Sequence, residues 1–323
     1  MKKVFIIISS LVLLSLFMAA CGPTPTPPAP VTVVVTQLVT QPPVAAPTVV
    51  PPTAAPTPVA SVDPSALSQK GKLLVCSDIP YAPFESFDDN GNPVGLDVDL
   101  AQGIADRLGL KLEVINSQFD TIIEAVSGGK CDIIMSDMNI TADRNKQISF
   151  IHYLQVGQSI LVAKGNPSNI NASTDLCGQS VAAESGTTEV DYLQGSGDYK
   201  GKGLAAACAA TGKQPVNVVT TSKDSDALQQ LQAGKVVAYF ADTPVAGQYA
   251  AQHPDQFQLV GQPIEPLPVG VGVPCGGASD CSSTPLTSLG QAIQTALTSM
   301  MADGSYLNIL TKYGSKDAAV TLP

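Results

Sequence analysis

The sequence predicts an α/β protein in which strands and helices alternate in two successive series. Short apolar runs, typical of buried strands, occur at residues 72–76, 111–115, 132–135, 159–163, 180–183, 216–219, 236–240 and 258–260. Stretches with helical apolar spacing separate these runs, and loops rich in small polar residues follow several of them. This alternation predicts parallel strands covered by helices, with ligands bound beyond the carboxyl ends of the strands.

The clearest helix signal is an apolar residue at every fourth position from Leu96 to Leu108, followed by Gly109. The same kind of spacing predicts further helices at residues 119–126, 225–233, 244–252 and 289–300. Arg107 falls on the polar side of the first of these helices. We therefore expect its side chain to be solvated.

The N-terminal segment predicts export and a lipid anchor. Lys2 and Lys3 precede an apolar run over residues 4–17, which makes residues 1–20 typical of a secretion signal. Cys21 directly follows the expected cleavage site, an arrangement that resembles the lipobox of bacterial lipoproteins, in which this cysteine is lipidated. The alternative is a cleaved signal with an unrelated cysteine. Lipidation would hold the protein on the extracytoplasmic face of a bacterial membrane.

Residues 21–64 are expected to form a tether between this anchor and a globular body. Residues 22–62 contain twelve prolines and no charged residue, and such a composition favours an extended chain over a packed core. The body that follows is long enough for two lobes. Removing the signal changes the formal charge from −10 to −12, which argues against nucleic acid or anionic lipid as a partner.

The cysteines support an oxidising compartment, because six remain besides Cys21 and an even number suits disulfides. The candidate bridges join Cys177 to Cys208 and Cys275 to Cys281. Cys76 and Cys131 lie on neighbouring predicted strands and are either a third pair or buried free thiols. The cysteine spacings do not suit zinc, and neither histidine is near a cysteine in the sequence. We expect no metal site and no cofactor.

The segment 131–147 contains the strongest functional signal. It predicts a buried strand, a polar turn over residues 136–141, and a helix that carries Arg144. A strand that leads into small polar residues and a helix start brings several donors to one point, which suits a small anion such as a carboxylate. Arg144 is one of two arginines in the chain, and its planar guanidinium matches a carboxylate bidentately. The alternative is a surface charge, or an ion pair with Asp143.

Between residues 71 and 314 the chain resembles the bacterial extracellular solute-binding proteins of family 3, which bind polar amino acids for ABC importers. The matching stretches are YAPFESFDDNGNPVGLDVDLAQGIADRLGL (81–110), FDTIIEAVSGGKCDIIMSDMNITADRNKQISF (119–150), SGTTEVDYL (185–193), ALQQLQAGKVVAYFADTPVA (227–246) and MADGSYLNILTKYG (301–314). The chain departs from the family pattern at Tyr313, where tryptophan is common, at Asp137, where a small residue is common, and in the insertion CGGASDC.

The resemblance implies a two-lobed periplasmic-binding-protein fold of type II, with two parallel-type sheets and two crossing hinge strands. Lobe 1 is expected at residues 65–157 and 269–323, and lobe 2 at residues 158–268. The resemblance further implies a monomer without enzymatic activity. Such a protein would bind an amino acid between its closing lobes and deliver it to an ABC transporter permease.

The resemblance also assigns the ligand contacts. The expected ligand-binding residues are Asp78, Tyr81, Phe119, Ser136, Asp137, Asn139, Arg144, Thr187, Thr188 and Asp242. Arg144 would hold the ligand carboxylate, and Thr188 of lobe 2 would approach the same carboxylate from the other side. Asp242 would pair with the α-ammonium group. Tyr81 and Phe119 would be aromatic walls on either side of the ligand side chain, and Asp78 would be a polar group that reaches toward its far end. The structural alternatives are a helix cap for Asp242 and the threonines, and core packing for the two rings.

The identity of the ligand follows from charge. Asp78, Asp137 and Asp242 make the expected pocket acidic, which favours arginine, lysine or ornithine. Glutamine or another polar amino acid is the alternative, because Asp78 can also accept hydrogen bonds from an amide.

Two other functions use the same fold. One is an enzyme resembling cyclohexadienyl dehydratase, with Glu85, Asp78 or Glu184 as general acid, and the other is a ligand-presenting component of a sensor.

Overall fold

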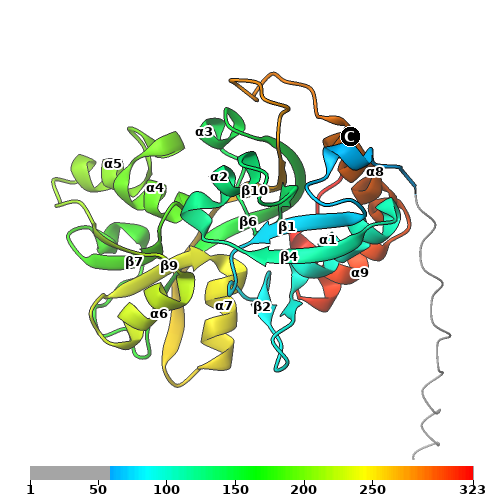
Figure 1. The fold of residues 1–323 in the computed structure, drawn as a ribbon. Coiled ribbons are helices and arrows are strands. Elements are labelled where there is room, and N and C mark those ends of the chain that lie inside the picture. The colour runs from blue at the N-terminus through cyan, green and yellow to red at the C-terminus, as the bar shows by residue number, and fades with distance from the viewer. Residues whose placement is uncertain (1–58, 323) are drawn as a thin grey trace, which may run out of the picture. The chain divides into compact units, whose positions relative to one another are not determined.

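The computed structural model describes residues 59–322 (Figure 1). The expected signal peptide, the expected lipidation site Cys21 and most of the expected tether lie outside the described residues. The strands are β1 (Lys72–Ser77), β2 (Ser86–Phe87), β3 (Pro93–Val94), β4 (Lys111–Asn116), β5 (Ile133–Ile134), β6 (Ser149–Ala163), β7 (Ser180–Glu184), β8 (Asn217–Thr221), β9 (Ala238–Asp242) and β10 (Phe257–Val273). The helices are α1 (Leu96–Leu108), α2 (Ile122–Ser127), α3 (Ala142–Asn145), α4 (Thr188–Gln194), α5 (Gly203–Ala210), α6 (Asp224–Gln232), α7 (Thr243–Gln252), α8 (Ser288–Ala302) and α9 (Ser305–Lys312).

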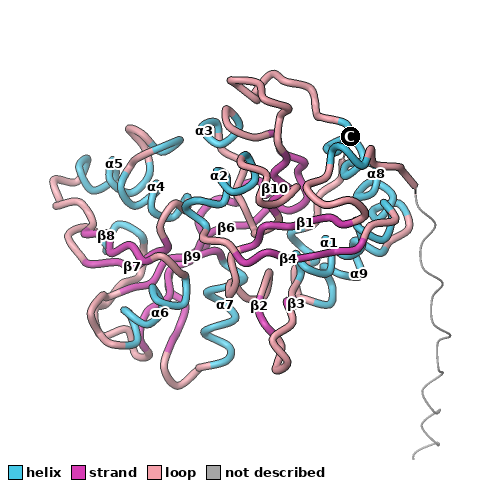
Figure 2. Tube along the Cα trace, viewed as in Figure 1, coloured by secondary structure: helices cyan, strands magenta, loops and turns pink. Residues whose placement is uncertain are grey.

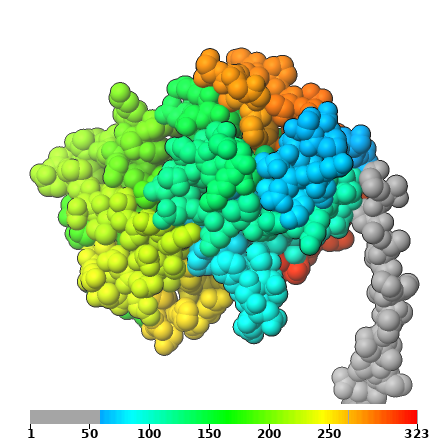
Figure 3. All heavy atoms as spheres, in the orientation of Figure 1, coloured from blue at the N-terminus to red at the C-terminus, as the bar shows by residue number. Residues whose placement is uncertain are grey.

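The strands of the main sheet follow the order β4-β1-β5-β10-β6-β9-β7-β8 (Figures 1 and 2). In lobe 1, β1 pairs in parallel with β4 and β5, and in lobe 2, β7 pairs in parallel with β8 and β9. Between the lobes, the long strands β6 and β10 run antiparallel to each other. The predicted two-lobed α/β fold with two crossing strands is confirmed, and these crossing strands join the two predicted sheets into one. Figure 3 shows the blue and cyan residues of lobe 1 beside the light green and yellow residues of lobe 2.

Helices pack on the sheet through the apolar faces that their spacing predicts. Leu100 and Ile104 of α1 are fully buried, as are Ile293 and Leu297 of α8, which packs against α1. Each such side chain contributes about 1.5–3 kcal/mol when it is removed from water. A second core in lobe 2 includes Val181, Leu193, Leu204 and Phe240. Within residues 59–322, no helix has the length and hydropathy required to cross a bilayer.

The expectation that Arg107 is solvated is wrong. This residue is only 5% exposed, and its guanidinium donates to Asp303, Ser305 and the Gly103 carbonyl. The side chain extends from the polar side of α1 to the turn between α8 and α9, where it finds acceptors that the helix pattern alone does not reveal. Arg107 therefore links α1 to the C-terminal helices.

The crossing strands are much longer than the sequence predicts. Apolar runs indicated only residues 159–163 and 258–260, whereas β6 and β10 span Ser149–Ala163 and Phe257–Val273. Polar residues such as Gln155 and Gln158 interrupt the apolar pattern of β6, because this strand leaves one lobe and enters the other. The helices α5 and α9 were not separately predicted.

All six cysteines of the body form disulfides. Cys177 pairs with Cys208 and Cys275 with Cys281, as their positions suggested, and Cys76 pairs with Cys131. The alternative of free thiols at Cys76 and Cys131 is therefore wrong in this structure. The bridges that span 31 and 55 residues lower the entropy of the unfolded chain, and in the loop-entropy account each adds about 4 kcal/mol to the free energy of unfolding.

Candidate ligand-binding site

A small, largely closed cavity lies where loops from both lobes meet. Its lining residues are Asp78, Tyr81, Phe119, Ser136, Asp137, Asn139, Glu184, Thr187, Glu189 and Asp242. Eight of the ten residues that the sequence predicts for the site are in this set. Arg144 and Thr188 are not, and Glu184 and Glu189 are additions. The carboxyl ends of β1, β5, β7 and β9 bring these residues together, as parallel strands in each lobe predict.

A direct polar contact joins the two lobes at Asp242. The Tyr81 hydroxyl donates to Asp242 Oδ2 at 2.9 Å, and the Asp242 backbone N–H donates to the Tyr81 oxygen at 3.2 Å. Asp242 stands at the N-cap position of α7, yet its side chain makes no capping hydrogen bond. The helix-cap alternative for Asp242 is therefore not realised. The Tyr81 ring stacks on Phe84 with centroids 6.1 Å apart, so its hydroxyl is held over the cavity.

Arg144 lies beside the cavity and does not line it. It is 8% exposed and lines an adjoining hollow that shares Phe119 with the cavity. Its Nη1 donates to the Asn139 carbonyl at 2.7 Å and its Nη2 to the Gly186 carbonyl of lobe 2 at 2.9 Å, while the guanidinium lies 5.3 Å from the Phe119 ring centroid. The alternatives for Arg144 are wrong, since the residue is buried and Asp143 pairs with Lys146.

Two of the five guanidinium N–H groups of Arg144 are used in the hydrogen bonds to Asn139 and Gly186. Burial lowers the pKa of Arg144, whereas the charges of Glu189 and Asp242 oppose this shift. Two cavity-lining carboxylates are thus close enough to act on the guanidinium. Arg144 therefore lies beside the cavity and joins lobe 1 to the Gly186 carbonyl of lobe 2.

The two threonines of the SGTT turn have different surroundings. Thr188 is buried away from the cavity, where its hydroxyl donates to Asn139 Oδ1 at 2.5 Å and accepts from Gln158 Nε2 at 2.9 Å. Thr187 lines the cavity, and its hydroxyl donates to the Glu184 carbonyl at 2.8 Å. Neither hydroxyl caps α4, because Thr187 is its N-cap residue and makes no side-chain capping bond. Thr188 positions Asn139 from across the lobe boundary.

Ser136 is fixed by two buried hydrogen bonds, to Glu85 and to the backbone of Asp78. Its hydroxyl donates to Glu85 Oε1 at 2.6 Å and accepts from the Asp78 backbone N–H at 2.8 Å. Glu85 is completely buried and lies outside the set of lining residues. Burial raises the pKa of Glu85 well above its usual value, and the charge of Asp97 adds to this effect. Glu85 therefore supports the wall through Ser136.

The cavity is lined by five carboxyl groups and by no lysine, arginine or histidine. They belong to Asp78, Asp137, Glu184, Glu189 and Asp242. Burial is the main cause that raises the pKa of each of them, to about 10 for Glu184. Mutual repulsion adds to this, as between Asp137 and Asp242. A cation placed in the cavity would offset these shifts.

Several lining atoms are buried without a hydrogen-bond partner among the described residues. These atoms are Asp137 Oδ1 and Oδ2, Asn139 Nδ2, Glu184 Oε1, Glu189 Oε1 and Asp242 Oδ1. Buried polar atoms are satisfied in the great majority of native sites, so such a cluster indicates groups reserved for a ligand. Glu184 was predicted only as a general acid, and Glu189 was not predicted. The signal that the sequence offered for both acids was that they flank the SGTT turn at the carboxyl end of a strand.

Buried carboxyl groups near the site predict how stability depends on pH. Burial raises the pKa of both Asp97 and Asp224 to about 7 in the fold, against about 3.9 in an unfolded chain. Between these pH values the folded state binds more protons than the unfolded state. The contribution of Asp97 and Asp224 to the free energy of unfolding is therefore fully present below about pH 4 and is lost as the pH rises to 7. For the ligand-free protein we expect a loss of about 1 kcal/mol or more per pH unit between pH 5 and 7, measured by urea unfolding.

The variant Asp224→Asn should flatten this slope, because an amide remains neutral over the whole range. Asp226→Asn is the matched control, since Asp226 is exposed on the same helix, α6, and its replacement should leave the slope unchanged. Stability that rises between pH 5 and 7 in the wild-type protein would contradict the prediction.

The fold and the enclosed cavity between the lobes define the class of two-lobed solute-binding proteins. The family model for bacterial extracellular solute-binding proteins, family 3, matches residues 73–316. The arginine-binding protein ArgT of Corynebacterium glutamicum is 27% identical over 260 residues, which cover 80% of this chain and 79% of that protein. The chain therefore belongs to family 3 of the bacterial extracellular solute-binding proteins.

Solved structures agree with this assignment. An ancestral arginine-binding protein bound to arginine has a TM-score of 0.65 and 33% identity, covering 76% of this chain and 98% of that one. A structure of an ancestral arginine-binding protein bound to glutamine has the same TM-score and identity, and covers 76% of this chain and 99% of that one.

Proposed function

We propose that this protein binds a cationic amino acid such as arginine, lysine or ornithine between its lobes. The observation that carries this proposal is the set of five buried carboxyl groups around one cavity, with no cationic side chain among its lining residues. An α-ammonium group and a cationic side chain would together place two positive charges among these acids. Both charges would be desolvated and close to carboxylates, where their attraction is strongest.

The residues then have distinct roles. Asp242 pairs with the α-ammonium group, and Tyr81 holds the Asp242 carboxylate in place. Phe119 and the Tyr81 ring form the walls against the aliphatic part of the side chain. Arg144 turns from the Gly186 carbonyl to the ligand carboxylate, with Asn139 beside it. Since Arg144 and Asp242 belong to opposite lobes, binding the ligand and closing the lobes are one event.

The relatives support transport as the biological role. An arginine-binding relative from Escherichia coli is described as an ABC transporter protein and is 28% identical over 231 residues, which cover 71% of this chain and 85% of that protein. Delivery to an ABC permease, lipidation of Cys21 and a tether over residues 21–64 complete the proposal. Lobe boundaries near residues 157 and 268 are part of the proposal, and the antiparallel passage of β6 and β10 between the lobes supports them.

Glutamine is the second candidate, because protonated carboxyl groups could donate to its side-chain oxygen. The raised pKa of Glu184, to about 10, favours such a donor when no cation is present. A dehydratase is disfavoured, because the relatives are named as arginine-binding proteins. Of the three acids considered for catalysis, Glu85 lies outside the cavity lining and is committed to Ser136, and Asp78 is paired with Lys223. We infer a binding protein and not an enzyme.

A thermal-shift screen with the twenty amino acids and ornithine tests the proposal. A ligand at about 100 times its Kd adds about 2.7 kcal/mol, which corresponds to roughly 5–10 °C for a domain of this size. Arginine, lysine and ornithine should raise the Tm most, and glutamate and aspartate should have no effect. A large shift with glutamine and none with arginine would replace the proposed ligand class with the second candidate.

A further inference from the structure

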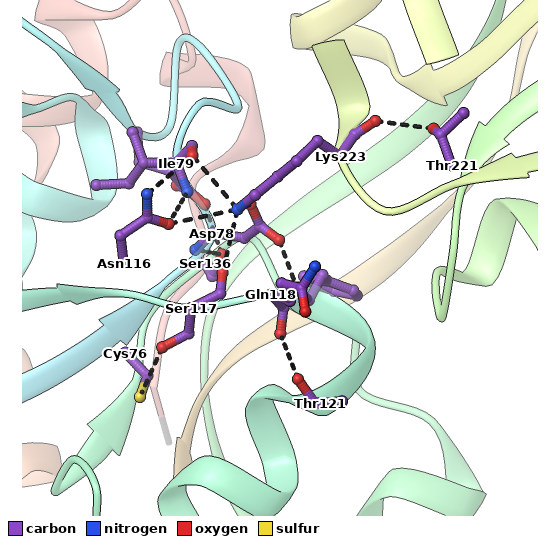
Figure 4. A network of polar contacts seen from close by, with 12 residues as sticks. Cys76, Asp78, Ile79, Asn116, Ser117, Gln118, Thr121, Ser136, Thr221 and Lys223 are labelled. Carbon is purple, nitrogen blue, oxygen red and sulfur yellow. Dashed lines mark hydrogen bonds and ion pairs between the residues drawn. The ribbon is translucent and has the colours of Figure 1, made fainter. Parts of the chain in front are cut away.

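A lysine of lobe 2 reaches across the cleft to lobe 1. Lys223 lies between β8 and α6, and its ammonium group donates to Asp78 Oδ1 (Figure 4). The carbonyls of Ile79 and Ser117 and the Asn116 side-chain oxygen surround the same ammonium at 3.4 Å. All four acceptors belong to lobe 1, so this single side chain holds the rim of the cleft closed. The sequence analysis did not identify Lys223.

The Lys223 ammonium lies outside the cavity and does not take the place of a ligand inside it. Lys223 is not among the lining residues, and its side chain is 24% exposed, whereas that of Asp78 is 2% exposed. Asp78 therefore stands between the cavity and Lys223. In Figure 4 the lysine approaches from the lobe 2 ribbon and ends beside Asp78.

Both carboxylate oxygens of Asp78 already have partners. Oδ1 accepts from Lys223, and Oδ2 accepts from the Phe119 backbone N–H at 2.6 Å. Burial raises the pKa of Asp78, and the hydrogen bond and the charge of Lys223 oppose this shift. Asp78 has thus little remaining need for a cation from the ligand, although the family resemblance placed the far end of the ligand there.

Glu184 lies next to Asp78 and is one of the lining acids with a carboxylate oxygen that lacks a partner among the described residues. It lies at the end of β7, lines the cavity, and its Oε1 makes no hydrogen bond among the described residues. Glu184 is only 5% exposed, and burial, together with repulsion from Asp78, raises its pKa. A cationic group of the ligand placed against Glu184 would satisfy this oxygen and relieve that repulsion.

We propose that Lys223 locks the closed cleft by pairing with Asp78, and that Glu184 receives the cationic end of the ligand side chain. The inference rests on the proposed function and deepens it, because it assigns closure and side-chain specificity to different residues. Asp78 then acts on the ligand through lobe closure, as a positioning residue. Glu184 contacts the ligand directly and determines the preference for a positive charge.

Calorimetric binding of arginine and of citrulline separates the two roles, because citrulline replaces the guanidinium with a neutral urea of similar shape. Lys223→Met should lower the affinity for both ligands by the same factor, roughly tenfold, because it shifts the lobes toward the open state. Asp78→Asn should have a similar effect, and the double variant should be little worse than either single one. Glu184→Gln should instead reduce the ratio of the affinity for arginine to the affinity for citrulline about tenfold or more.

Lys235→Met is the matched control, because Lys235 is exposed in lobe 2 and its replacement removes the same charge. It should bind both ligands as the wild type does. If Lys223→Met tightens arginine but not citrulline, Lys223 competes with the ligand for Asp78 and the proposed lock is overturned. If Asp78→Asn abolishes the preference for arginine while Glu184→Gln leaves it unchanged, the assignment of Glu184 is overturned.

Failure of the proposed function has a different signature. A wild-type protein that binds no amino acid would refute that function and, with it, the role of Glu184. Small-angle scattering of the ligand-free protein still decides the role of Lys223. Lys223→Met should then have a larger radius of gyration than the wild type and Lys235→Met, and equal radii would overturn the lock.

Discussion

Replacement of Arg144 by alanine is expected to weaken binding of every α-amino acid ligand by about 2–4 kcal/mol, or roughly 30- to 700-fold in Kd. The variant would leave the buried ligand carboxylate without its charged partner. It would also remove the hydrogen bond from Arg144 to the Gly186 carbonyl, which joins the lobes at 2.9 Å. Titration calorimetry with the ligand found by the thermal-shift screen measures the loss.

Two variants on the same segment serve as controls. Arg144→Lys keeps the charge but loses the planar fork, so most of the affinity should still be lost. Lys146→Met removes a positive charge from an exposed pair with Asp143, two residues beyond Arg144, and should bind as the wild type does. Unchanged affinity in Arg144→Ala would show that Arg144 only braces the closed lobes.

The affinity for arginine is expected to rise with pH, by up to about tenfold per pH unit between pH 5.5 and 8. Burial raises the pKa of the lining carboxyl groups, to about 10 for Glu184, so several of them hold protons when no ligand is bound. A cationic ligand stabilises the ionised forms, and binding therefore releases protons. By linkage, proton release makes binding stronger as the pH rises.

Calorimetry in two buffers with different ionisation enthalpies counts the protons released at a fixed pH. Glu184→Gln removes one titrating group and should reduce both the proton count and the slope of affinity against pH. Citrulline is the neutral reference ligand, and its affinity should depend less on pH. An affinity for arginine that falls between pH 5.5 and 8 would contradict the acidic site that we describe.

Much of the fold could be predicted because its signals are local. The four-residue apolar spacing from Leu96 to Leu108 predicts α1, and the apolar runs predict β1, β4, β7 and β9 within a few residues. The extent of β6 and β10 could not be predicted in this way. These strands cross between the lobes, so their burial follows from the packing of both lobes and does not alternate simply along the chain.

The candidate site was predictable where its residues follow a strand. Asp78, Ser136 and Asp242 occupy such positions, and parallel pairing brings the ends of neighbouring strands to one edge of a sheet. Glu189 was not found, because an acid in the first turn of a helix usually serves the helix itself. Its place beside the SGTT turn was the one available signal, and this alone does not distinguish a solvated acid from one that faces a cavity.

The sequence by itself determined the α/β class, the family, and the loops that meet at the cleft, because these depend on local pattern and on the order of motifs. Only the tertiary structure decided how the charged side chains are paired. Lys223 and Asp78 are 145 positions apart in the sequence, yet they form the pair at the rim. Arg144 joins the two lobes by donating to the Gly186 carbonyl. Such pairings depend on distances across the cleft, and these exist only once both lobes have folded.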